Sequence, residues 1–236
     1  MGNVGDNIKT DNACWSFGGQ VADEFDDHVS KSVPLYNEGH DIIVKISDFF
    51  LEEGSVCYDL GCSTGQLTCR IANHNKNKKV RFIAVDREDG MIEQARSKCK
   101  GLKSIDVLKS DLMDLELEKA DFIISYYTMQ FIRPKNRQIM IRRIYEALNW
   151  GGAFLLFEKV RGPDARFQDF MTAVYTDYKM EQGYLAEEIV EKSRSLKGIL
   201  EPFSTQGNID LLKRAGFIDI MTILKFACFE GFLAIK

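Results

Sequence analysis

The chain has 236 residues, 45% of them hydrophobic and 28% charged, with a net charge of −4 at pH 7 and six cysteines that form no Cys-x-x-Cys pair. These values suit one folded α/β domain and exclude a largely disordered chain, a disulfide framework and a strongly basic nucleic-acid binder. No apolar run reaches the roughly 20 residues that cross a bilayer and no zinc-type spacing occurs, so we expect a cytoplasmic protein without a membrane span, a metal ion or direct nucleic-acid binding.

Strand and helix patterns alternate along most of the chain, after an N-terminal stretch outside that pattern. Residues 13–53 hold several aromatic side chains before a predicted helix at 41–50, and we interpret them as an N-terminal cap. From about residue 55, apolar runs predict strands at 56–60, 80–86, 105–108, 122–125 and 153–157. Helices are predicted between them at 66–73, 90–100 and 136–149, the last ended by Gly151 and Gly152.

Residues 161–205 interrupt the alternation with two further helix patterns. The first has a sharp apolar stripe, which indicates a core face or a dimer interface, with a wall of a substrate site as the alternative. The stripe consists of Phe167, Phe170, Met171, Val174, Tyr175 and Tyr178. We expect this helical insert to cover the site together with the N-terminal cap.

The end of the chain predicts one more helix, which closes at Phe217, and two strands at 218–225 and 228–235 that pair as an antiparallel hairpin. Repeated strand–helix units predict an α/β fold with a doubly wound, seven-stranded sheet and an antiparallel C-terminal strand. We assign residues 1–236 to a single domain. Ligands of such sheets bind at the carboxyl ends of the parallel strands.

A glycine turn follows the first strand of this sheet. Asp59 stands two residues before Gly61, and Gly65 ends a G-x-x-x-G turn that also contains Cys62 and Ser63. Glycine lets bare backbone approach a ligand and allows a positive φ. A dinucleotide site would show G-x-G-x-x-G, and Asp59 would repel its pyrophosphate, whereas S-adenosyl-L-methionine carries an ammonium and a sulfonium that a carboxylate attracts. The turn therefore predicts S-adenosyl-L-methionine as the cofactor.

Two more carboxylates stand at the ends of the next strands. Asp86 ends the second strand and can accept hydrogen bonds from both ribose hydroxyls of an adenosine. Asp111 lies just beyond the third strand and is placed to meet the adenine amino group. Three acids at successive strand ends therefore predict a nucleoside site.

Several short motifs are spread from about Phe17 to the C-terminus. They are Ser32-Val33-Pro34-x-Tyr36, Asp59-Leu60-Gly61-Cys62-Ser63, Asp86, Thr128-x-Gln130-Phe131, Leu148-Asn149-x-Gly151-Gly152, Glu158-Lys159 and Lys213-x-Ala215-Gly216-Phe217. Together they resemble the carboxy-S-adenosylmethionine synthase family of the class I S-adenosylmethionine-dependent methyltransferase superfamily.

The resemblance implies a class I methyltransferase, Rossmann-like fold and a homodimer. It also implies a reaction in which carboxy-S-adenosyl-L-methionine is made from S-adenosyl-L-methionine and prephenate, for wobble-uridine modification in tRNA. The nucleoside site that it implies is lined by Tyr36, Gly61, Cys62, Ser63, Asp86, Arg87, Asp111 and Leu112.

The sequence departs from the family pattern at two positions. Tyr126 stands where the family has an asparagine after the fourth strand. Ser193 stands where the family has a signature arginine that binds the extra carboxylate of the cofactor, between Lys192 and Arg194. If this segment is helical, Ser193 faces inward, Lys192 flanks the inward stripe and Arg194 faces the polar side. A lysine offers one point charge, whereas an arginine holds a carboxylate through two bonds.

Two reactions therefore stay open. The leading hypothesis is a methyltransferase that acts on a small molecule or metabolite-like acceptor, held in line with the methyl group and away from water. The alternative is the carboxy-S-adenosylmethionine synthase reaction, with Lys192 or Arg194 holding the carboxylate. A third hypothesis, a non-catalytic nucleoside-binding subunit, would be indicated by a broken glycine turn, and the turn is intact. Candidates for a catalytic base are Tyr126, Tyr127, His28 and Glu158.

Overall fold

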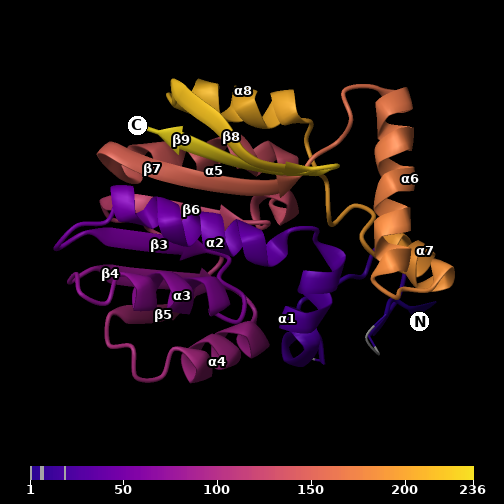
Figure 1. Cartoon of the computed structure of the whole chain (residues 1–236), viewed down its shortest axis with the longest axis horizontal. Helices are drawn as coiled ribbons and strands as arrows, with labels where there is room; N and C mark the ends of the chain where they lie inside the picture. The colour runs from indigo at the N-terminus through magenta and orange to yellow at the C-terminus, as the bar shows by residue number, and fades with distance from the viewer. Residues whose placement is uncertain (1, 6–7, 19) are drawn as a thin grey trace.

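The apolar runs of the sequence pair into one mixed sheet, as Figure 1 shows for the computed structural model of this chain. The structure describes residues 2–5, 8–18 and 20–236. Within these ranges, the seven strands of this sheet lie in the order β5-β4-β3-β6-β7-β9-β8, and β9 runs opposite to the other six. The predicted sheet is thereby confirmed. Its strands are β3 (Val56–Leu60), β4 (Arg81–Asp86), β5 (Ile105–Lys109), β6 (Ala120–Tyr126), β7 (Leu148–Lys159), β8 (Asp219–Phe226) and β9 (Phe229–Ile235).

Helices cover both faces of the sheet, because successive side chains of a strand point to opposite faces. Cys57 of β3 packs into the cluster that holds α2 and α3, whereas Tyr58 packs into the cluster that holds α5 and α8. Through Ala95, α4 packs against Ala84 of β4. Among the described residues, no helix combines the length and the apolar character that crossing a bilayer requires. These helices are α2 (Tyr36–Ile46), α3 (Gln66–His74), α4 (Asp89–Lys98), α5 (Pro134–Ala147) and α8 (Thr205–Ala215).

The C-terminal end of α5 differs from the prediction. The helix ends at Ala147, and the next residue, Leu148, already pairs with Ala120 as the first residue of β7. Gly151 and Gly152, expected to end the helix, instead lie inside β7, where the register with β6 shifts. Since Gly151 has φ 78°, which glycine adopts without strain, the glycines serve this strand irregularity and not the helix end.

The N-terminal cap contains a helix that the sequence did not reveal, α1 (Gln20–Ser32). Phe25, His28 and Ser32 are buried on its inward face, although two of these three are polar. Because His28 and Ser32 face a cavity and not the core, the apolar period expected of a helix is broken in the sequence. The next helix, α2, also begins earlier than predicted, at Tyr36 instead of residue 41.

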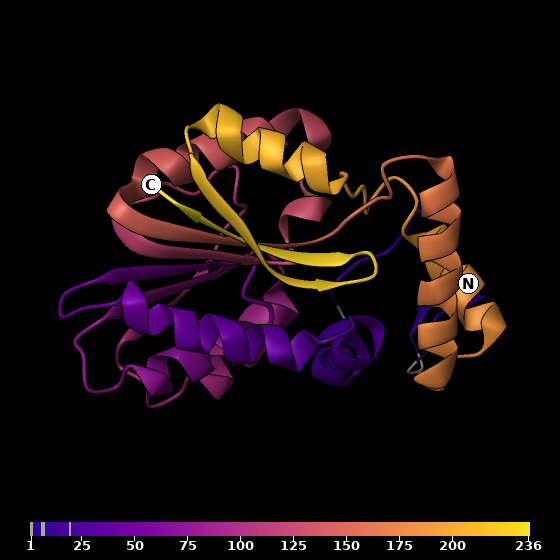
Figure 2. The ribbon, with the colours of Figure 1, turned by 45° about the horizontal axis from the view of Figure 1, so that its top comes forward.

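The predicted insert consists of α6 (Ala165–Glu181) and α7 (Ala186–Ser195), which lie at one end of the sheet beside α1 (Figure 1). In Figure 2, α6 lies beyond the ends of the strands and is joined to them by the chain that leaves β7. The N-terminal segment binds α7, since the N–H groups of Ala13 and Trp15 donate to the carbonyls of Arg194 and Ser195 at 3.0 and 3.2 Å. The two stretches outside the strand–helix pattern are thus tied to each other.

The apolar stripe of α6 is divided between two environments. Met171 and Tyr175 pack against the cluster that contains β7 and β9. Phe167, Phe170 and Val174 are instead 44, 56 and 45% exposed. The stripe therefore contributes both to the interior and to an exposed apolar surface.

Candidate functional site

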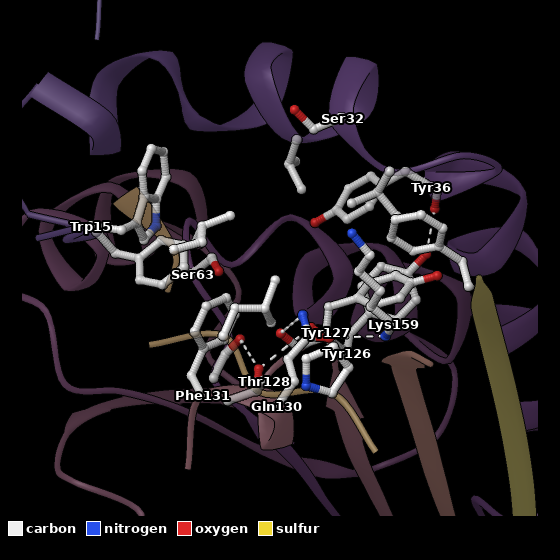
Figure 3. Close-up of a pocket in the computed structure, with 18 of the residues that line it drawn as sticks. Trp15, Ser32, Tyr36, Ser63, Tyr126, Tyr127, Thr128, Gln130, Phe131 and Lys159 are labelled. Atoms are coloured by element: carbon white, nitrogen blue, oxygen red, sulfur yellow. Dashed lines mark hydrogen bonds between the residues drawn. The ribbon is translucent and has the colours of Figure 1, made fainter. Parts of the chain in front are cut away.

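A cavity of about 870 Å³ lies at the carboxyl ends of the parallel strands, the place where doubly wound sheets bind ligands. The loops after β3, β4, β5 and β6 line one part of it, and residues of α1, α2, α6 and α7 and of the adjoining ends of β7 and β9 line other parts. In the view of Figure 3, Trp15 and Ser63 lie on one side of the pocket and Tyr36, Tyr127 and Lys159 on the other. We call the lining residues at the ends of β3 to β6 the sheet wall, and the lining residues of the two capping segments, together with Lys159 beside Tyr175, the capping wall.

The glycine turn brings backbone to the cavity in the way its sequence predicts. Gly61 has φ 82°, and a Cβ at this position would collide with the side chain of Thr128. The N–H groups of Gly61 and Cys62 donate to the carbonyl of Val85, at 2.8 and 2.9 Å, and so fasten the turn to β4. Gly61, Cys62 and Ser63 all line the cavity, and the contact with Thr128 leaves room only for glycine at the first of them.

The three acids predicted to form a nucleoside site line one cavity. Asp59 is 2% exposed and accepts a hydrogen bond from Thr68 Oγ1 at 2.6 Å. Burial is the main cause that raises the pKa of Asp59 to about 6, and the nearby charge of Asp86 contributes to this increase. Asp86 accepts from the N–H groups of Ser63 and Glu88, both at 3.0 Å, yet burial raises its pKa as well. The third acid, Asp111, is exposed to the cavity.

Buried carboxylates with raised pKa values favour a cationic ligand, because a positive charge restores the ionised form. S-adenosyl-L-methionine carries two such charges, and the residues at this wall fit it. The cofactor-binding candidates Arg87 and Leu112 line the cavity beside these acids. Arg87 pairs with Glu88 at 3.0 Å.

Three tyrosines form an aromatic wall next to the acids. Tyr126 Oη donates to the carbonyl of Tyr36 at 2.6 Å, and the ring of Tyr126 lies 5.1 Å from that of Tyr36 and 4.8 Å from that of Tyr127. Burial raises the pKa of all three phenols far above the usual value. They therefore stay protonated at neutral pH, which makes Tyr126 and Tyr127 poor candidates for a base.

Three of the predicted site residues, all within the described ranges, do not line the cavity: Gly65, Glu158 and Arg194. Gly65 precedes α3 with φ 75°, and an added Cβ would lie 3.1 Å from Ala95 Cβ, so its role is to close the turn. Glu158 is buried behind the cavity, where it accepts from the N–H of Gln130 at 3.1 Å and where burial raises its pKa to about 8. His28, the remaining base candidate, lines the cavity.

The segment in which Ser193 replaces the family arginine places a lysine in the cavity. Lys192 and Ser193 both line it, whereas Arg194 is on the outside and pairs with Glu191 at 3.0 Å. The Lys192 ammonium contacts the ring of His28 and lies 4.5 Å from the centroid of the Trp15 ring. Of the two cations beside Ser193, Lys192 is therefore the one that reaches the site.

Two further lysines of the cavity were not predicted as site residues, Lys159 and Lys179. Lys159 ends β7, and Lys179 lies on α6. A signal for Lys179 was present in the sequence, since it follows Met171 and Tyr175 at helical spacing and so falls on the buried side of the α6 stripe. For Lys159 the sequence offered only its place in the Glu158-Lys159 motif.

Comparisons with known proteins show the family of the chain. Residues 57–152 match the family model described as a methyltransferase domain. Over 223 residues the chain is 38% identical to a carboxy-S-adenosyl-L-methionine synthase of Staphylococcus epidermidis, covering 94% of this chain and 97% of that protein. The chain belongs to the carboxy-S-adenosylmethionine synthase family. A relative from Sulfurimonas denitrificans with the same name is 36% identical, with 94% of each chain covered.

Solved structures agree on the fold. Human N-acetylserotonin methyltransferase in complex with S-adenosylmethionine matches with a TM-score of 0.60 at 17% identity, over 86% of this chain and 52% of that one. The [4+2]-cyclase SpnF matches with a TM-score of 0.56 at 18% identity, over 79% and 60%. Together with the methyltransferase-domain match and the synthase relatives, this fold makes the chain a class I S-adenosylmethionine-dependent transferase. Of the two reactions left open by the sequence, the family favours the carboxy-S-adenosylmethionine synthase reaction over methyl transfer to an acceptor.

Proposed function

We propose that this chain makes carboxy-S-adenosyl-L-methionine from S-adenosyl-L-methionine and prephenate, in the cytoplasm, for the modification of wobble uridine in tRNA. The proposal takes residues 1–236 as one domain whose site is covered by residues 13–53 and 161–205. The observation that carries it is the position of Lys192, a cation in the cavity beside the Ser193 that replaces the family arginine.

The nucleoside is proposed to bind along the sheet wall. Asp86 would accept from the ribose hydroxyls, Asp111 would meet the adenine, and Asp59 would attract the cationic groups of the cofactor. The remaining residues that we propose in contact with the cofactor are Tyr36, Gly61, Cys62, Ser63, Arg87, Leu112 and Tyr126, all of which line the cavity.

The reaction balances without a further reactant. Prephenate loses its ring carboxyl group as carbon dioxide and its ring hydroxyl as hydroxide, which leaves phenylpyruvate. The carboxyl carbon forms a bond to the methyl carbon of the cofactor, and the proton lost from that carbon combines with the hydroxide to give water. The protein has to hold the two reactants together, exclude water and bind the carboxylate of the product. Of the four candidates for a base, Glu158 does not line the cavity, and Tyr126 and Tyr127 are phenols that stay protonated. His28 lines the cavity and is therefore the candidate that relays the proton.

The proposed role of Lys192 follows from its surroundings. The face of Trp15 and the ring of His28 fix the ammonium at the cavity wall, and Ser32 Oγ lies 3.5 Å from it. A carboxylate on the cofactor methyl would gain a charge-assisted hydrogen bond from this ammonium. Because a lysine binds through a single charge, we expect this carboxylate to be held less tightly than by an arginine.

Mass spectrometry of the cofactor released from purified protein tests the proposal. We expect carboxy-S-adenosyl-L-methionine from the wild type, and its formation from prephenate and S-adenosyl-L-methionine in the purified system. Lys192→Met should lose most of the carboxylated cofactor, whereas Arg194→Met, the matched change on the outer side of α7, should keep it. Release of unmodified S-adenosyl-L-methionine together with no consumption of prephenate would contradict the proposal.

A second candidate is methyl transfer to a small acceptor, and Ser193 favours it because the family arginine is absent. It predicts S-adenosylhomocysteine as the product with an acceptor present and no carboxylated cofactor at any stage. The same mass spectra therefore separate the two functions.

We also propose a homodimer, as the family resemblance implies. Phe167, Phe170 and Val174 give α6 an exposed apolar face of the kind that subunit interfaces cover. Sedimentation should show a dimer for the wild type and a larger monomer fraction for Phe170→Asp.

A further inference from the structure

Lys159 and Lys179 share one tyrosine ring inside the cavity. Their ammonium groups lie 4.1 and 4.6 Å from the centroid of Tyr175. The ring itself is fixed, because Tyr175 Oη donates to the carbonyl of Ser32 in α1 at 2.7 Å. Cation–π contact at these distances holds both lysines in the cavity wall, where β7, α6 and α1 meet.

The two charges lie close to each other and lack an anion. Lys179 is 7% exposed, and its pKa is lowered to about 8, mainly by burial and in part by the positive charge of Lys159. Burial lowers the pKa of Lys159 too. Within the described residues, no carboxylate forms an ion pair with either ammonium. Since buried charges in proteins are normally paired, this arrangement indicates that a ligand supplies the anion.

A third donor points to the same ligand. Tyr127 is 8% exposed and lines the cavity, and its hydroxyl has no hydrogen-bond partner among the described residues. The Phe229 ring connects it to the lysines, since this ring lies 5.8 Å from the Tyr127 ring, 5.1 Å from the Tyr175 ring and 5.7 Å from the Lys159 ammonium. A buried hydroxyl without a partner is costly and is a mark of a group that a ligand completes.

We propose that Lys159, Lys179 and the Tyr127 hydroxyl form a binding subsite for the carboxylate that the co-substrate keeps during the reaction. Two ammonium groups and one hydroxyl match the two oxygens of a carboxylate, which accept several hydrogen bonds. The faces of Tyr175 and Phe229 beside them suit a flat apolar body attached to that carboxylate. This inference rests on the proposed function, in which prephenate gives up one carboxylate and phenylpyruvate retains the other.

The subsite is separate from the position assigned to the cofactor carboxylate. Lys192 lies over Trp15, whereas Lys159 lies over Tyr175 and Phe229. In Figure 3, Lys159 is on the side of Tyr36 and Tyr127, away from Trp15. Two anion positions in one cavity suit a donor with two carboxylates, one transferred near Lys192 and one retained near Lys159.

Calorimetry on the full chain loaded with S-adenosylhomocysteine tests the subsite without turnover. Phenylpyruvate and its uncharged methyl ester are titrated into the wild type, Lys159→Met, Lys179→Met and Lys179→Arg. The wild type should bind the acid and discriminate against the ester. Either methionine variant should weaken binding of the acid about ten- to hundredfold, and Lys179→Arg should recover most of it. Lys213→Met, a change to an exposed lysine of α8 away from the cavity, is the matched control and should change nothing.

Anion binding should also weaken as the pH rises through about 8, because Lys179 then loses its proton. The groups that face Lys179 are Lys159 from β7, Cys228 from the turn between β8 and β9, and Tyr175 from its own helix. Lys179→Arg should remove this dependence, since arginine keeps its charge.

Equal binding of the acid and the ester by the wild type, no binding of the acid, or full binding by both methionine variants would each overturn the subsite. The first two readouts need no variant, and thermal unfolding shows whether a variant is folded. If mass spectrometry finds carboxylated cofactor and the methionine variants keep the wild-type KM for prephenate, the subsite fails and the proposed function stands. If no carboxylated cofactor forms but the lysines still select the acid, the proposed function fails and the subsite serves another carboxylate.

Discussion

The two walls of the cavity carry opposite charges and are built in different ways. On the sheet wall, Asp59 is the last residue but one of β3, and Asp86 is the last residue of β4. On the capping wall, Lys159 at the end of β7 and Lys179 of α6 share the ring of Tyr175, and Lys192 of α7 lies over Trp15. In both walls burial disfavours the charged form, since the pKa values of the acids are raised and those of Lys159 and Lys179 are lowered.

The opposite charges of the two walls indicate which kinds of ligand the cavity binds together. A cation relieves the sheet wall and an anion relieves the capping wall, so neither wall alone is suited to the ligand of the other. A cationic nucleoside beside a dianionic co-substrate satisfies both walls at once. The fold thus holds charges that cost stability until the ligands arrive, a common feature of functional sites.

The largest difference in stability is expected when a glycine is replaced in the turn of the sheet wall and, for comparison, in the helical insert. Gly61→Ala should lower the free energy of unfolding by about 3 kcal/mol, because it combines a positive φ with overlap on Thr128. Gly183, between α6 and α7, has φ 92° with nothing within 4 Å of an added Cβ, so Gly183→Ala should cost only about 1 kcal/mol. Urea unfolding measures both, and equal losses would show that the Gly61 turn is not constrained by its neighbour.

Removal of one acid should weaken cofactor binding next most strongly. Asp86→Ala should reduce the affinity for S-adenosyl-L-methionine by about 1–3 kcal/mol, because a carboxylate that accepts from two ribose hydroxyls is lost. Asp89→Ala, in the exposed first turn of α4, is the control and should bind normally. Unchanged affinity of Asp86→Ala in calorimetry would mean that the nucleoside does not lie along the sheet wall.

The sheet wall was predictable from sequence because its parts are local. A strand, a glycine turn and an acid at the strand end lie within a few residues of each other, and parallel strands bring their carboxyl ends to one edge. The strands themselves were predicted to within a residue or two in most cases, although the start of β7 was missed because helix and strand follow without a loop. The cofactor class could therefore be inferred before the structure.

The capping wall was not predictable in the same way. The polar residues His28 and Ser32 interrupt the apolar pattern of α1, so the helix was not predicted. Lys159 looks like an ordinary surface lysine in the sequence, and the α6 stripe indicates only that Lys179 is on the buried side of the helix, not that both ammonium groups contact Tyr175. Long-range packing of α6 on β7 and β9 places them, and no local pattern encodes that packing. The helical period did predict correctly that Arg194 faces outward.

The capping wall should become more stable when one of its charges is removed. Lys179→Met should raise the free energy of unfolding at pH 7 by about 1–2 kcal/mol, since a buried ammonium with a lowered pKa opposes folding and methionine does not, while the lost contact with Tyr175 offsets part of the gain. For a lysine whose pKa is depressed in the folded state, the cost is fully present below about pH 8 and is relieved as the pH rises towards the value of the unfolded chain.

Urea unfolding at pH 7 and pH 9.5 checks both the size and the sign. The advantage of Lys179→Met over the wild type should shrink at the higher pH. Lys135→Met, at an exposed position of α5, should show no advantage at either pH. A wild type that is more stable than Lys179→Met at pH 7 would mean that the lysine stabilises the fold without a ligand.

The smallest effect tests the sheet wall by pH. Asp59 has a raised pKa of about 6, with Thr68 of α3 and Asp86 of β4 as the groups that face it. Above pH 6 the carboxylate is ionised and attracts the cationic cofactor, and below pH 6 it takes up a proton and the attraction is lost. The affinity for S-adenosyl-L-methionine should therefore fall about tenfold between pH 7 and pH 5. Asp59→Asn should bind more weakly at pH 7 but with a flatter pH profile, and the slope that remains reports Asp86. A wild-type affinity that is constant over this range would place the cationic groups of the cofactor away from Asp59 and would weaken the division of the cavity into an acidic and a basic wall.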